Sequence, residues 1–526
     1  MKTNQQLRQL IIVAGAGAQF ALPAFAADGA ATGTNGTASV EIPAFAADGG
    51  NSSEAAEIKA LKQQVEALIQ KVNALEQQRG PAEQAATIQD LDQKVKILAR
   101  QRELDQDAAL AAAKTAPKLS VGPGGLSASS ADTNFVFTLR GLVQVDSRSF
   151  FNDSAIRSND GFLLRRARPI FQGTLYRDFD FRFTPDFGGS TVQIFDAYGN
   201  YRYAPWAQLR AGKFKTPVGL EQLQEDVNTS FNERSLVTDL VPNRDVGLQL
   251  WGDIDGGVLS YAAGIFNGVG DSRNSSNSAF ENDVEFAGRL FALPFKNTDL
   301  AALQNLGFGI AGSTEHDSGV ASTGLPSTTG GTLPGYTTDG QQQFFAYNPA
   351  TGAGTVVAKG QHWRLSPQGS YYYGPFSLLG EYAISDQGVS KGAAKANLHN
   401  TAWEISGGWV LTGENASFAG VTPLHPFDPR GGQWGALQVV ARYAELNIDH
   451  AAFPVFSNPD TSASAAQAWS VGLNWYLNKN IRLNTSYSHT TFTGGGGGTG
   501  AAAQTAPSIV TRQPESVLFT RIQLAF

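Results

Sequence analysis

The sequence of 526 residues contains no cysteine and only one methionine. Without cysteine, the chain can form neither a disulfide scaffold nor a site that depends on thiolate chemistry. After the amino terminus it also lacks an apolar run long enough for a membrane-spanning helix, which argues against a helical membrane protein. The net charge of -7 argues against a nucleic-acid partner, although it does not report the local charge inside a pore.

Signatures of catalysis are also absent from the sequence. There is no G-x-S-x-G, no phosphate-binding loop and no H-E-x-x-H, and the six histidines show no metal-ligand spacing. They are His316, His362, His399, His425, His450 and His489. We therefore predict neither enzymatic activity, nor a metal, nor a cofactor. A catalytic Ser, His and acid assembled from separate strands is the alternative that the sequence leaves open.

The amino terminus has the pattern of a secretory signal peptide, predicted for residues 1–26. Lys2 and Arg8 precede a largely apolar stretch, and Ala24-Phe25-Ala26 supplies a small-residue cleavage site. The residues that follow, 27–53, are small and polar, which predicts a flexible segment.

An apolar seam with spacings of three and four predicts an α-helical coiled coil at 54–112. The first part of the seam ends before Gly80-Pro81, and a second part resumes out of phase. A single amphipathic helix packed on another element is the alternative. Pro117, Pro123 and a run of Gly, Ser and Ala predict a linker at 113–134. The seam residues are Ile58, Leu61, Val65, Leu68, Val72, Leu75, Ile88, Leu91, Val95 and Leu98.

From residue 135 to 526 the apolar period changes to two, which is typical of β-strands. In the last strand, Leu518, Ile522 and Phe526 share one face, and Arg521 lies on the other. An arginine on the lipid face costs about 2 to 4 kcal/mol at mid-membrane, so the polar faces are expected to line a lumen. With about 24 residues per strand and connection, we predict an all-β transmembrane barrel of about 16 antiparallel strands.

Two low-complexity stretches interrupt the strand pattern. Residues 313–361 are rich in Thr, Gly and Pro, and 494–503 combine a glycine run with alanines. Both are expected to be extracellular loops, because periplasmic turns of such barrels are short.

An ordered set of motifs between Phe162 and Gly268 resembles the phosphate-selective porin O/P family. The set comprises F-L-L-R-R-A (162–167), L-Y-R-D-F-D-F (175–181), I-F-D-A (194–197), L-R-A-G-K-F-K-T-P-V-G-L-E (209–221) and N-E-R (232–234). The resemblance implies a trimer of 16-stranded barrels whose pores carry a ladder of arginines, a central lysine and a nearby aspartate.

The resemblance carries over to individual positions of this sequence. The paired ladder arginines match Arg165 and Arg166, the arginine of N-E-R matches Arg234, and the pore aspartate matches Asp196. The position of the central lysine holds Gln222 instead. The long loop at 313–361 also has no upper arginine cluster, so both departures put phosphate specificity in doubt.

Further candidates for anion binding follow from strand parity. Arg140, Arg182 and Arg210 can point inward, and Lys213 and Lys215 share a face just before Thr216-Pro217. The alternative is that they form rim ion pairs or ordinary wall contacts. Because Arg165 and Arg166 are adjacent, a bulge or a rim position must reconcile their directions. The charged loop 218–244 either narrows the pore or lies on the surface with solvated charges.

The sequence therefore predicts a passive bacterial outer-membrane channel for small anions, phosphate or polyphosphate among them, with an Arg- and Lys-lined pore. Its expected partners are small phosphate-like anions, outer-membrane lipid and two further copies in a homotrimer. The coiled coil would lie in the periplasm, with contact to the cell wall as one role. A general or differently selective porin is one alternative, and a coiled-coil anchor held by the barrel is the other.

Overall fold

The computed structural model describes residues 52–76, 81–151, 153, 158–189, 191–275, 284–319, 333–348, 354–496 and 511–526. The predicted signal peptide lies outside these residues, as does nearly all of the predicted flexible segment. The chain divides into two compact units, Met1–Leu104 and Asp105–Phe526.

Two helices form where the seam with spacings of three and four was identified. They are α1 (Ser52–Glu76) and α2 (Pro81–Thr115). Pro81 begins α2, a position at which the missing N–H of proline costs no hydrogen bond. Seam residues remain exposed in the single chain, 56% for Leu61 and 57% for Leu98. The coiled coil itself stays a prediction. Neither these nor the other helices of the described chain are long and apolar enough to cross a membrane.

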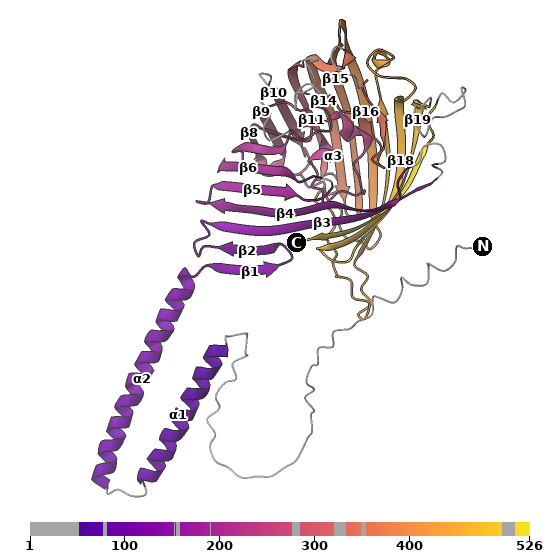
Figure 1. Ribbon diagram of the computed structural model, residues 1–526. Helices are drawn as coiled ribbons and strands as arrows, with labels where there is room; N and C mark the ends of the chain where they lie inside the picture. The colour runs from indigo at the N-terminus through magenta and orange to yellow at the C-terminus, as the bar shows by residue number, and fades with distance from the viewer. Residues whose placement is uncertain are drawn as a thin grey trace, which may run out of the picture. The chain divides into compact units, whose positions relative to one another are not determined.

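Within the described residues, sixteen antiparallel strands form a closed barrel in which β20 pairs with β3 (Figure 1). This confirms the predicted all-β barrel and its strand number. The strands are β3 (Val136–Phe151), β4 (Gly161–Leu175), β5 (Phe179–Asp186), β6 (Gln193–Ala204), β7 (Ala207–Lys215), β8 (Arg244–Ile254), β9 (Leu259–Phe266), β10 (Glu285–Ala292), β11 (Leu306–Ser318), β14 (Val357–Tyr373), β15 (Phe376–Lys391), β16 (Ala394–Val410), β17 (Ala436–Asn447), β18 (Ala463–Tyr476), β19 (Ile481–Gly494) and β20 (Glu515–Ala525).

The alternation of side chains sorts the two faces of the barrel wall as expected. Trp469 and Leu473 of β18 are 43% and 44% exposed on the outside, whereas Ser470 and Asn474 between them are buried. In β20, Ile522 points outward and Arg521 is completely buried. Apolar side chains thus face lipid, where burying a charge is costly, and polar ones face the lumen.

The predicted linker at 113–134 is different in the structure. It contains the end of α2 and a hairpin of β1 (Lys118–Gly122) and β2 (Gly125–Ser129). Strand β2 pairs with the part of β3 that lies beyond the end of β20, at Val136–Leu139. Its glycines and serines misled the sequence prediction, because pairing with a free strand edge needs only backbone groups.

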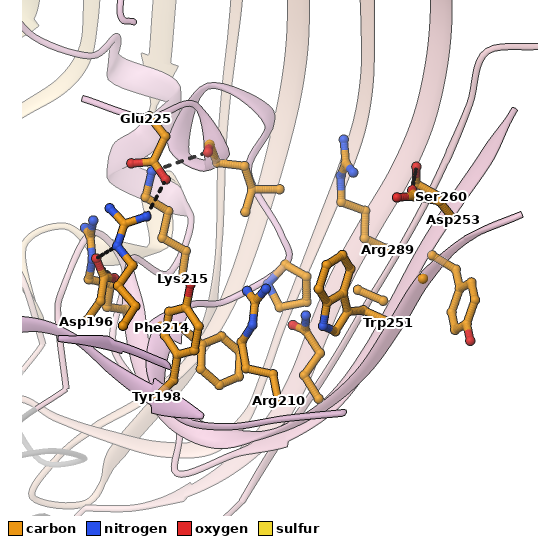
Figure 2. Close-up of a pocket in the computed structure, with 18 residues that line it drawn as sticks. Asp196, Tyr198, Arg210, Phe214, Lys215, Glu225, Trp251, Asp253, Ser260 and Arg289 are labelled. Carbon is orange, nitrogen blue, oxygen red and sulfur yellow. Dashed lines mark hydrogen bonds and ion pairs between the residues drawn. The ribbon is translucent and has the colours of Figure 1, made fainter. Parts of the chain in front are cut away.

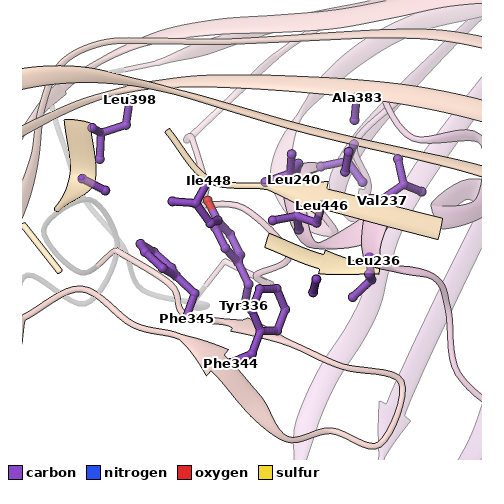
Figure 3. Close-up of a cluster of buried hydrophobic side chains, with 14 of the residues drawn as sticks. Leu236, Val237, Leu240, Tyr336, Phe344, Phe345, Ala383, Leu398, Leu446 and Ile448 are labelled. Atoms are coloured by element: carbon purple, nitrogen blue, oxygen red, sulfur yellow. The ribbon is translucent and has the colours of Figure 1, made fainter. Parts of the chain in front are cut away.

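The loop region expected at 313–361 also differs. Residues 313–318 belong to β11, and 357–361 belong to β14. Between them, β12 (Tyr336–Thr337) and β13 (Gln343–Phe345) fold inward, and Tyr336, Phe344 and Phe345 are almost fully buried. They join an apolar cluster with Leu236, Leu240, Leu398, Leu446 and Ile448 (Figure 3). Much of the predicted 494–503 insert, residues 497–503, lies outside the described residues.

The connections at the end of the barrel that carries the chain terminus are not all short. Residues 411–435 join β16 to β17 at that end, and this connection reaches back into the lumen. There, the side chain of Gln224 donates a hydrogen bond of 2.9 Å to the carbonyl of Phe418. In contrast, β15 and β16 are joined at the opposite end by Gly392-Ala393 alone. Loop length therefore does not assign every connection to a side.

Gly125 provides a test of the added hairpin. Its φ of +98° is in the left-handed region, and a β-carbon there would lie 2.1 Å from the carbonyl oxygen of Leu139. Gly125→Val is therefore expected to detach the hairpin and to accelerate amide hydrogen exchange at 118–129 about tenfold or more. Gly124→Val is the matched control, because no atom beyond Gly124 and its two chain neighbours lies within 4 Å of the β-carbon position there. Equal exchange in both variants would contradict this role of Gly125.

Candidate functional site

The connection between β7 and β8, residues 216–243, crosses the lumen and is called the inner loop here. It contains α3 (Leu220–Leu223) and the 3-10 helix η1 (Leu236–Leu240), whose leucines and Val237 are buried. On the opposite wall, the carboxylate of Glu381 accepts hydrogen bonds from the backbone N–H groups of Leu220 and Glu221, at 2.9 and 3.0 Å. The loop is therefore a constriction inside the barrel and not a surface loop.

The paired arginines of β4 are separated by a β-bulge. Gln144 of β3 pairs with Arg166, and Val145 pairs with Leu164, so Arg165 is the extra residue. This confirms that a bulge reconciles the two adjacent side chains. Arg165 makes a bidentate contact with Glu233 of the inner loop, with its Nε at 2.6 Å and its Nη2 at 2.9 Å from the two carboxylate oxygens.

The carboxylate of Asp226 in the inner loop forms ion pairs with three arginines. Its carboxylate lies 2.5 Å from Nη1 of Arg234 and 3.4 Å from Nε of Arg166, and it accepts a hydrogen bond from Arg168. Burial would raise the pKa of Asp226, but the charges of Arg166, Arg234 and Arg168 hold that pKa well below its usual range. Asp226 thus stays ionised and ties the loop to the wall.

Two cavities lie beside the inner loop, and Arg244 lines both. The upper cavity, of about 530 Å³, extends towards the β12–β13 hairpin and includes Arg165, Arg234 and Gln222. The lower cavity, of about 310 Å³, extends towards the turn after Asp253 (Figure 2). It includes Arg182, Arg210 and Lys215.

Asp196 lies where the two cavities approach each other. One of its carboxylate oxygens is 3.0 Å from Nε of Arg244, and the other is 3.5 Å from Nε of Arg182. Next to this group, Nζ of Lys215 donates to the backbone carbonyls of Leu223 and Gln224, at 3.3 and 2.7 Å. Three cations, Arg182, Lys215 and Arg244, therefore lie here with two carboxylates, those of Asp196 and Glu225, the latter 3.3 Å from Nη1 of Arg182.

Eight of the ten predicted site residues line one of the two cavities, and Arg140 and Lys213 do not. Arg140 is half-buried on β3, and Lys213 is buried with its Nζ 2.5 Å from the carbonyl of Ser275. Four further arginines line the cavities and were not in the predicted set, namely Arg168, Arg244, Arg273 and Arg289. Strand parity already allowed Arg168 and Arg289 to point inward, whereas Arg244 begins β8 after a loop whose course the sequence does not reveal.

One group in the described barrel brings possible metal ligands together. Ligand atoms of Glu315, Asp317 and His362 lie within 4.8 Å of one another. Both ring nitrogens of His362 are already engaged, with Glu315 at 2.9 Å and with the hydroxyl of Ser385 at 3.0 Å. The side chain of Gln387 donates to Asp317 at 2.6 Å. The group is thus an internally satisfied hydrogen-bond network.

Comparison with known proteins identifies the kind of channel. A family model for phosphate-selective porin O and P matches residues 137–506. The chain belongs to this family. As a porin, it is a non-enzymatic channel of the bacterial outer membrane, from a family of anion channels.

Individual relatives are distant from this porin. Porin O of Pseudomonas aeruginosa is 22% identical over 379 residues, and the match covers 69% of this chain and 85% of the relative. An anion-selective porin from Comamonas acidovorans aligns with a TM-score of 0.46 and 12% identity, over 74% of this chain and 100% of that chain. The outer membrane channel DcaP of Acinetobacter baumannii aligns with a TM-score of 0.45 and 11% identity, over 75% of this chain and 98% of that chain.

Asp226→Asn tests whether the ion pairs of Asp226 hold the inner loop against the barrel wall. Removing one partner of a buried ion pair costs about 3 to 5 kcal/mol, and here three arginines lose their counter-charge. We expect a lower unfolding temperature of the purified barrel. In a KCl gradient, we expect the reversal potential to move towards the equilibrium potential of chloride.

Asp299→Asn is the matched control for Asp226→Asn, because Asp299 is exposed in the connection between β10 and β11. Unchanged selectivity of a folded Asp226→Asn barrel would show that these arginines do not act on permeating ions.

Proposed function

We propose that this porin admits small anions, phosphate or polyphosphate among them, through a pore lined by arginine and lysine. The observation that carries the proposal is the charge of the two cavity walls. Six arginines and three acids line the upper cavity, and four arginines, one lysine and three acids line the lower cavity.

This excess of positive charge supports anion selectivity on physical grounds. Fixed positive groups replace part of the hydration shell of an anion, and the low-dielectric wall of a barrel concentrates their field. Most of these arginines are paired with carboxylates, so the field that a permeating ion meets is weaker than the count of arginines suggests. We therefore infer an anion preference without the tight binding of a dedicated phosphate site.

Gln222 is central to the question of phosphate. In place of the central lysine of the family, its amide donates a hydrogen bond to the side chain of Asn243. The ammonium group of Lys215 lies nearby on the carbonyls of Leu223 and Gln224, which supports some remaining attraction for phosphate. A general porin is the alternative that a neutral Gln222 favours.

Planar-bilayer recordings of the purified protein test this function. In a KCl gradient, we expect a reversal potential closer to the equilibrium potential of chloride than to that of potassium. We also expect phosphate at high concentration to block the current. Gln222→Lys adds a cation beside the upper cavity and is expected to lower the half-blocking phosphate concentration about tenfold, which corresponds to about 1.4 kcal/mol.

Gln341→Lys is the matched control, because Gln341 also lines the upper cavity but belongs to the β12–β13 hairpin. It is expected to change phosphate block less than Gln222→Lys does. A current without anion preference would leave a general porin, and no current from folded protein would favour the anchor.

We further infer that the barrels form homotrimers and that α1 and α2 form a coiled coil in the periplasm, within reach of the cell wall. The exposed seam supports the coiled-coil part of this proposal, since Leu61 and Val65 present apolar surface in the single chain. Because the chain has no cysteine, one introduced thiol reports association directly.

Leu61→Cys is expected to give a disulfide-linked dimer band on mild oxidation of the native oligomer, since seam residues of neighbouring helices meet. Gln63→Cys, two residues away and off the seam, is expected to remain mostly monomeric. Equal cross-linking at the two positions would contradict a coiled coil with this seam.

A further inference from the structure

The arginines of the lower cavity are not all paired with carboxylates. Within the described part of the chain, Arg210 and Arg289 have no carboxylate oxygen within 4.0 Å. The three acids that line this cavity contact other groups. Asp196 contacts Arg244 and Arg182, Glu225 lies 3.3 Å from Arg182, and Asp253 accepts a hydrogen bond from Ser260. Uncompensated positive charge is therefore available in the lower cavity.

Arg210 is held between aromatic rings. The carbon at the centre of its guanidinium group lies 4.6 Å from the ring centre of Tyr198, 4.7 Å from that of Trp251 and 5.4 Å from that of Phe214 (Figure 2). Its Nε is buried without a hydrogen-bond partner among the described residues. Rings attract the face of a guanidinium plane and leave its N–H edges for a ligand.

The aromatic frame is fixed by its neighbours. Nε1 of Trp251 donates to Oδ1 of Asn200 at 2.8 Å, and the Asn200 amide donates to Gln208 at 3.1 Å. Gly212 allows the backbone of Tyr198 to pack closely against it, because a β-carbon at 212 would lie 2.7 Å from the Cα of Tyr198. The cage around Arg210 is thus built before any ligand arrives, which lowers the entropy cost of binding.

We infer that the lower cavity binds organic anions with a flat aromatic body, and that the carboxylate is held by Arg210. This inference rests on the proposed anion channel and names a substrate class for it. A carboxylate matches the planar N–H edge of a guanidinium group with two parallel hydrogen bonds. The aromatic body then covers ring surface of Trp251 and Tyr198 that is otherwise in contact with water.

The size and position of the cavity agree with such a ligand. A cavity of about 150 Å³ takes up benzene, and the lower cavity has about 310 Å³. Inorganic phosphate would meet the same arginine but would gain nothing from the rings. The preference for aromatic anions is therefore separate from any phosphate affinity of the upper cavity.

Block of the chloride current by benzoate, compared with block by acetate, tests this inference on the full-length protein in planar bilayers. Both ions carry one carboxylate, so the ratio of their half-blocking concentrations isolates the aromatic ring. We expect benzoate to block at a concentration about tenfold lower than acetate in the wild type, and at a similar concentration in Arg210→Gln.

Two further variants keep the test decisive. Arg210→Lys retains the charge but not the planar donors, and it is expected to lose most of the preference even if Arg210→Gln fails to fold. Trp251→Leu is expected to weaken benzoate block more than phosphate block. Arg202→Gln is the charge-matched control, because Arg202 is exposed and paired with Asp180 at 3.1 Å.

Two results would overturn the inference. They are equal block by benzoate and acetate in the wild type, and a benzoate preference that survives in both Arg210 variants. The KCl reversal potential separates this failure from failure of the proposed function, because an anion-selective channel without benzoate preference retains the function and loses only the substrate class.

Discussion

Buried pairing between carboxylates of the inner loop and arginines of the barrel wall is the interaction on which the lumen depends. Asp226 and Glu233 neutralise arginines that would otherwise be desolvated without a counter-charge. A buried ion pair adds little net stability compared with apolar packing, but losing one partner is costly. The pairs therefore fix the position of the loop more than they strengthen the barrel.

The same pairing determines where an anion can find free charge. In the upper cavity, five of the six arginines contact carboxylates, and Arg273 has no carboxylate partner among the described residues. In the lower cavity, Arg210 and Arg289 have no such partner among the described residues, and Arg210 is enclosed by rings. Counting arginines in the sequence therefore overestimates the positive field in the upper cavity. In the lower cavity, the same count does not show that aromatic rings surround Arg210.

Strand alternation was enough to predict the strands and which of their faces meet lipid, because these follow from a local period of two. The strand number was predicted from the length of the region, at about 24 residues per strand and connection. The adjacency of Arg165 and Arg166 predicted either a bulge or a rim position, and the strand register shows the bulge. The β1–β2 hairpin and the inward course of residues 333–348 were missed. Their segments lack a clear alternation, and the partners that hold them are far away in the chain.

By itself, the sequence determined the barrel, its family and eight of the residues that line its cavities, since these depend on side-chain spacing and on short sequence motifs. Only the tertiary structure decided which arginines are neutralised. Asp226 lies 60 positions after Arg166 and Glu233 lies 68 after Arg165 in the chain, yet they meet in space. Ion pairing acts over a few ångströms of space, and no local pattern records which distant residues a folded loop brings together.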